Sequence, residues 1–178
     1  MLDQVIQVFL RDWTRAETIR FLISFTALFL PLAVWGAVPP LRRRGEALLV
    51  LFSLFTGAYA LFSAYALAFD GGATADLLAW APSPFAIKLG IFHAACGAAL
   101  LICLALKRIE GTKGLLIALA LYAAASAVIH LMAVFGHGRL TLAHMGPPLW
   151  HDILLVIVVF WVLRKTEGRK TIVYYVPR

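Results

Sequence analysis

Charged residues are scarce in this sequence, because Asp, Glu, Lys and Arg together make up only 14% of its 178 residues. Soluble domains carry about 25%. Hydrophobic residues reach 62%. This balance excludes an ordinary soluble domain and predicts an integral membrane protein, with the lipid bilayer as its principal partner.

Cysteines and catalytic motifs are also few. The two cysteines, Cys96 and Cys103, lie in one apolar run, which excludes a disulfide framework and a CxxC redox pair. The sequence contains no GxSxG, HExxH, P-loop or dinucleotide fingerprint. It therefore favours a non-enzymatic role without excluding an enzyme.

Five apolar runs dominate the chain, and stretches rich in Gly, Pro or charge separate them. A membrane-spanning helix needs about 20 apolar residues. The pattern predicts an all-α polytopic membrane helix bundle that forms one domain over residues 1–178. Its five transmembrane helices are expected at 21–38, 47–69, 85–106, 115–135 and 149–163, followed by a tail at 164–178.

The first 13 residues are too polar to span a bilayer. Leu2, Ile6, Phe9 and Trp13 recur at helical spacing, with polar residues mostly on the other side. This pattern predicts an amphipathic helix in the plane of the membrane interface over residues 1–13.

The net charge of +7 comes from short basic clusters beside the apolar runs, which are orientation signals rather than a nucleic-acid surface. No nucleic-acid partner is expected. The positive-inside rule predicts a cytoplasmic C-terminus and an external N-terminus. The clusters on the predicted cytoplasmic face are 42–44, Lys107, Arg108 and Lys113, and the tail with Arg164 and Lys165.

Four of the five histidines stand at every seventh position, at His130, His137, His144 and His151. The glycines and prolines between them forbid one continuous helix, so this regular spacing is a coincidence. His137 and His144 are expected in a solvated loop. The depth at which the other histidines lie in the membrane is what indicates a site.

Depth follows from the 1.5 Å rise per helical residue, counted from the basic residue that ends each span. This places His93 about 21 Å, His151 about 20 Å, Asp152 about 18 Å and His130 about 25 Å from the cytoplasmic surface. All four fall inside a hydrocarbon core that is roughly 30 Å thick. The sequence predicts a polar site in the outer half of the third to fifth spans.

Asp152 is the strongest signal for this site. The fifth span is so short that it crosses the hydrocarbon core only if Asp152 lies inside the core. A lipid-facing carboxylate would be costly, so Asp152 is expected to face the bundle and to be paired or protonated. Ser126 lies one turn before His130, and Tyr59 of the second span reaches a similar height. The predicted ligand-binding residues are Tyr59, His93, Ser126, His130, His151 and Asp152.

Three roles are compatible with the histidines: interhelical hydrogen bonding, binding of a ligand or proton, and ligation of a metal or haem. Residue type alone would allow a zinc or copper ion on His93, His130, His151 and Asp152. Two opposed histidines, His93 and His130, could hold a haem. No cofactor is therefore assigned.

The stretch from Trp80 to Arg164, with "APSPFAIKLGIFHAACG", "AVIHLMAVFGHG" and "GPPLWHDILL", resembles an uncharacterised family of small bacterial multi-span membrane proteins. Lys88 stands where an acidic residue is expected, and His93 where Asn is expected. The resemblance implies a bacterial inner-membrane location and importance for His130 and Asp152. The matching residues are Ser83, Pro84, Phe85, Gly90, His130, Trp150, Asp152 and Ile153.

Together these patterns favour a protein that binds or passes a small ligand, ion or proton at the His/Asp site. One alternative is a structural or accessory subunit of a larger membrane complex, or a homo-oligomer, in which the polar residues only fix helix packing. A second alternative is a membrane redox protein that holds haem or metal.

Overall fold

The computed structural model describes residues 15–39, 45–69, 84–137 and 147–167. These residues form five α-helices. The predicted interfacial helix at 1–13, His144 and the tail beyond residue 167 lie outside the described residues. The helices are α2 (Arg15–Ala37), α4 (Gly45–Phe69), α6 (Pro84–Ala105), α7 (Ile109–His137) and α9 (Pro147–Glu167).

Each predicted transmembrane range coincides with one helix and extends at most one residue past its end. The helices also continue beyond the apolar runs. α7 begins at Ile109 rather than Leu115 and ends at His137, which was predicted in the loop. α9 begins at Pro147, because proline fits the first turn of a helix, where no intrahelical N–H bond is lost.

Three helical segments are long and apolar enough to cross a membrane: Gly45–Ala68, Ile87–Ala105 and Ile109–Gly136, with 24, 19 and 28 residues. Phe21–Ala37 of α2 is a shorter apolar segment. The all-helical architecture predicted from the sequence is therefore confirmed, together with three candidate membrane spans.

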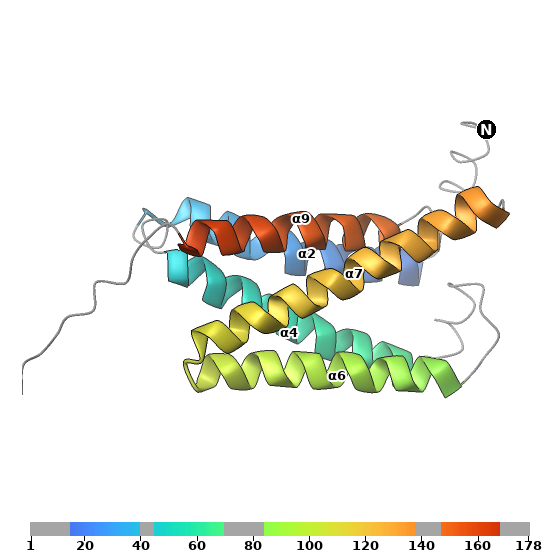
Figure 1. Ribbon diagram of the computed structural model, residues 1–178, viewed down its shortest axis with the longest axis horizontal. Helices are drawn as coiled ribbons and strands as arrows, with labels where there is room; N and C mark the ends of the chain where they lie inside the picture. The colour runs from blue at the N-terminus through green and yellow to red at the C-terminus, as the bar shows by residue number, and fades with distance from the viewer. Residues whose placement is uncertain (1–14, 40–44, 70–83, 138–146, 168–178) are drawn as a thin grey trace, which may run out of the picture.

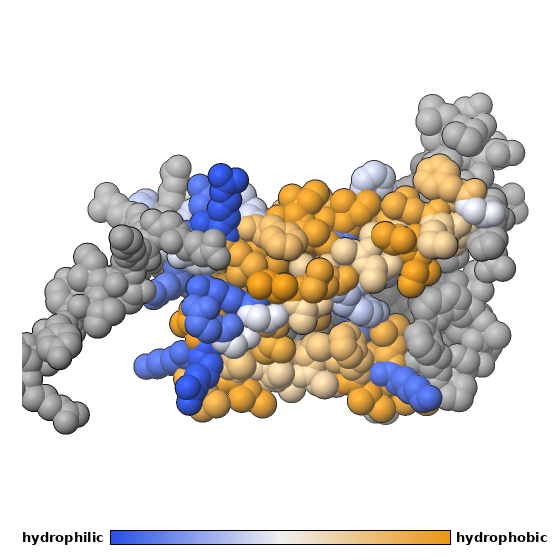
Figure 2. All heavy atoms as spheres, in the orientation of Figure 1, coloured by the Kyte–Doolittle hydropathy of each residue, from blue (hydrophilic) through white to orange (hydrophobic). Residues whose placement is uncertain are grey.

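The helices run alternately up and down along the long axis, so that α2, α6 and α9 end where α4 and α7 begin (Figure 1). α4 packs most extensively against α6 and also contacts α2 and α9. α7 packs against α9 and α6. Hydrophilic residues gather at one end of the bundle, and apolar residues cover most of its length (Figure 2).

We call this hydrophilic end the basic end. It carries Lys107, Arg108, Lys113, Arg164 and Lys165, at the end of α6, the start of α7 and the end of α9. The alternation of the helices therefore gathers separate basic clusters at one end, as the sequence predicts.

Small residues bring α4 and α6 together. A Cβ added at Gly57 would lie 3.0 Å from Leu101, and one at Gly90 would lie 3.2 Å from the carbonyl oxygen of Ala64. Such close backbone approach is typical of helix pairs in membranes. Gly57, Gly90 and Gly97 therefore form a close contact between the two helices.

The turn between α6 and α7 is a Schellman motif. Lys107 adopts a left-handed conformation with φ 54°. Its N–H donates to the Leu104 carbonyl at 3.0 Å, and the Arg108 N–H donates to the Cys103 carbonyl at 2.7 Å. These two bonds satisfy carbonyl groups that the helix end would leave unpaired.

Candidate functional site

The site begins with two neighbours in the second turn of α9. His151 Nδ1 lies 3.7 Å from Asp152 Oδ1, and the two side chains are 11% and 16% exposed. This distance is too long for a direct hydrogen bond, and the two side chains form an ion pair only when the imidazole is protonated. As predicted, Asp152 is largely shielded within the bundle and has a histidine beside it.

Helix α4 contributes Tyr59, whose ring packs on His151. The ring centroids are 5.0 Å apart, and the planes are inclined by 48°. Both residues occupy the half of the bundle away from the basic end, because α4 and α9 run in opposite directions. The predicted height of Tyr59 therefore agrees with its contact in the structure.

Helices α6 and α7 contribute a second aromatic pair. The His93 ring meets Tyr122 edge to face, with centroids 5.6 Å apart. Phe92 contacts both rings, with its centroid 6.1 Å from His93 and 5.2 Å from Tyr122. The phenol hydroxyl of Tyr122 adds a group that can donate or accept a hydrogen bond.

The two pairs lie on helices that pack against one another. Helix α9, with His151 and Asp152, packs against α4, which carries Tyr59, and against α7, which carries Tyr122. Four helices thus direct titratable side chains toward one region. We call this group the polar cluster, and it consists of Tyr59, His93, Tyr122, His151 and Asp152.

His130 and Ser126 take a different place. His130 is buried, with 7% exposed, on the interior stripe of α7 that includes Ala123 and Ala127. It lies two turns, about 12 Å along the axis, beyond Tyr122. Ser126 is half-buried and lies between them, one turn from each.

These positions bear on the cofactor alternatives. His93 contacts Tyr122 and so lies near that level of α7, about two helical turns from the level of His130, whereas a haem needs two opposed histidines. Within the described ranges, no group of three or more His, Cys, Asp or Glu side chains could hold a metal ion. Since His93, His130, His151 and Asp152 are all described, they do not form the zinc or copper site that their residue types would allow.

Tyr122 was missed by the reasoning from the sequence. It lies four residues before Ser126 and nine after Lys113, which places it near mid-membrane, about 14 Å from the basic end. A hydroxyl at that depth is itself a signal, because polar groups in the hydrocarbon core need partners. Phe92 was missed as well, and an aromatic residue in an apolar run carries no such signal.

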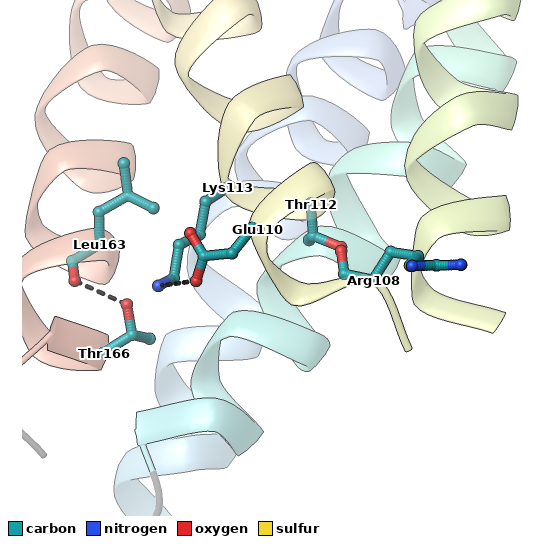
Figure 3. A network of polar contacts seen from close by, with 6 residues as sticks. All are labelled: Arg108, Glu110, Thr112, Lys113, Leu163 and Thr166. Atoms are coloured by element: carbon teal, nitrogen blue, oxygen red, sulfur yellow. Dashed lines mark hydrogen bonds and ion pairs between the residues drawn. The ribbon is translucent and has the colours of Figure 1, made fainter. Parts of the chain in front are cut away.

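Polar contacts at the basic end are local and distinct from this cluster (Figure 3). Lys113 Nζ donates to Glu110 Oε1 at 2.8 Å, and Glu110 is 84% exposed. The Thr112 hydroxyl donates to the Arg108 carbonyl at 3.0 Å, and the Thr166 hydroxyl donates to the Leu163 carbonyl at 2.6 Å. Each contact stays within its own helix or turn.

Residues 16–171 match the model of DUF6790, a family of unknown function. The chain belongs to this family. The DUF6790 match covers more of the sequence than the resemblance noted from Trp80 to Arg164, and it agrees with membership of an uncharacterised family. No solved structure matches the chain.

Proposed function

We propose that this DUF6790 protein is a five-span membrane protein that binds a proton or another small cation at the polar cluster. The observation that carries the proposal is the shielded position of Asp152 beside His151, whose ring packs on Tyr59. Ionisable groups inside a membrane are costly, and they typically mark binding sites or proton relays.

The outer surface of the bundle supports a membrane setting. Every helix carries exposed large apolar side chains, including Leu22, Leu54, Ile91, Leu121 and Ile157. Soluble monomers rarely expose continuous apolar surface on this scale. Lipid is the surrounding medium that would accommodate these faces without cost.

The position of α9 supports counting it as the fifth span. It packs against α7 and α4, which are both long enough to cross a membrane. Counted at 1.5 Å per residue, Asp152 lies about 18 Å from Arg164, well inside a core roughly 30 Å thick. The same antiparallel packing on α4 supports α2 as the first span.

The chemistry of the cluster suits a proton or small cation. A carboxylate only accepts hydrogen bonds, whereas a neutral imidazole offers one donor and one acceptor. An added proton could therefore be shared between Asp152 and a neighbouring ring, with Tyr59 and Tyr122 at the edge. A cation would gain from the carboxylate charge and the faces of the aromatic rings.

Infrared difference spectroscopy on the purified protein tests this proposal. As the pH falls, the wild type is expected to gain the C=O band of a protonated carboxyl group that Asp152→Asn lacks. Glu110→Gln is the matched control, because Glu110 is exposed and paired at the basic end. The absence of any Asp152-dependent band, in water or with added Na⁺ or K⁺, would refute the proposal. Stoichiometric copurifying partners would then favour the accessory-subunit alternative.

A further inference from the structure

The half of the bundle near the basic end has an apolar interior. By helical rise, these side chains lie within about 14 Å of the basic end. We call this group the apolar plug. It consists of Leu28, Leu48, Leu49, Phe52, Leu100, Leu116, Leu119, Ala120, Val158, Val159, Val162 and Leu163.

All five helices contribute to the plug, and most of its members are fully buried. Phe52 from α4, Leu100 from α6 and Leu116 from α7 each have no exposed surface. Apolar interiors packed to this degree hold no water, because their walls offer it no hydrogen bonds. A proton or cation would therefore meet a dry barrier there.

The polar cluster occupies the other half. The buried or half-buried titratable side chains of this half are Tyr59 on α4, His93 and Cys96 on α6, Tyr122 and His130 on α7, and His151 and Asp152 on α9. Among the described side chains of α2, residues 21–39, there is no titratable group. Within about 14 Å of the basic end, the buried polar side chains among the described residues are Ser53 and Thr112, and neither of them carries a charge.

We infer that the polar cluster exchanges its proton or cation only with the compartment opposite the basic end, so the protein binds this ligand without passing it across the membrane. This inference rests on the function proposed above. It makes occupancy of the site a response to the composition of one compartment, which is the behaviour of a receptor or sensor rather than of a channel.

Two isosteric cysteine substitutions test access to the two halves. Ser126 lies on α7, one turn after Tyr122 of the polar cluster. Ser53 is fully buried and is the chain neighbour of the plug residue Phe52. Ser126→Cys and Ser53→Cys are introduced separately into a background that carries Cys96→Ala and Cys103→Ala. A membrane-impermeant thiosulfonate is then added to right-side-out or inverted membrane vesicles.

Ser126→Cys is expected to react from the side opposite the basic end only, and Ser53→Cys from neither side. Reaction of Ser53→Cys from either side, or of Ser126→Cys from both sides or from neither, would overturn the inference. Because thiol labelling measures access and not proton binding, it can fail while the infrared band of Asp152 is still present. The two failures are therefore distinguishable.

A flux measurement provides the second readout. Proteoliposomes that contain a pH-sensitive dye receive a potassium diffusion potential from valinomycin. Wild type and Asp152→Asn are expected to show the same proton leak as each other, since no path crosses the plug. A wild-type flux that Asp152→Asn abolishes would show passage and contradict the inference, while confirming that the site binds protons.

Discussion

A Cβ added at Gly97 of α6 would lie 2.8 Å from the carbonyl oxygen of Gly57 on α4. Gly97→Ala should therefore push the two helices apart and destabilise the bundle by about 1 to 3 kcal/mol, as overpacking does. Thermal unfolding in detergent measures the change.

Gly114→Ala is the control, because nothing lies within 4 Å of a Cβ added at Gly114. Alanine is the better helix former, so this variant should be unchanged or up to about 1 kcal/mol more stable. Equal destabilisation of Gly97→Ala and Gly114→Ala would show that the close contact between α4 and α6 is not formed.

Lys107 provides a test of backbone strain. Its φ of 54° is costly for a residue with a Cβ and easy for glycine, so Lys107→Gly is expected to raise stability by about 1 kcal/mol. Lys107→Ala removes the same charge and retains the strain, and it should bring no such gain. If both variants gain equally, the effect comes from the charge rather than from the turn.

Ser53 provides a test of buried polarity. Its Oγ is buried and has no hydrogen-bond partner among the described residues, so Ser53→Ala should stabilise the protein by about 1 kcal/mol or more. Ser24 is also buried, but its hydroxyl donates to the Phe21 carbonyl at 2.8 Å. Ser24→Ala should therefore show no gain in melting temperature, and the reverse order of the two variants would contradict the described packing.

The basic clusters allow a test of orientation. A reporter fused after Arg178 is expected to lie in the cytoplasm, and one inserted in the 70–83 segment is expected to lie outside. The reason is that the basic end carries the positive-inside signal. Periplasmic activity of the C-terminal fusion would reverse the topology, although it would leave the helix contacts intact.

The sequence predicts the helices well, because each apolar run ends at charge, glycine or proline. It predicts their ends less well, since helical hydrogen bonding continues past the apolar core, as at Ile109 and Pro147. Small residues such as Gly57, Gly90 and Gly97 are typical of close helix contacts, but only the structure shows that they join α4 to α6.

For the other helices, the sequence does not predict which side is buried in the bundle. A helix that is apolar all round has no amphipathic pattern to show which side is buried. His93 was consequently placed at the right depth without its neighbour Tyr122, and only the packing of α6 against α7 brings them together. For Tyr59, the sequence predicted a height similar to that of the site but not the contact with His151.

The claim that Asp152 is held inside the bundle by the polar cluster has a direct test in the thermal unfolding of Asp152→Ala beside Glu110→Ala. Removing one partner of a buried charged pair costs about 3 to 5 kcal/mol, whereas an exposed pair contributes about 0 to 1 kcal/mol. We predict a marked fall in the melting temperature of Asp152→Ala in detergent and almost none for Glu110→Ala. Equal stability of the two variants would place the Asp152 carboxylate at the surface and contradict the account.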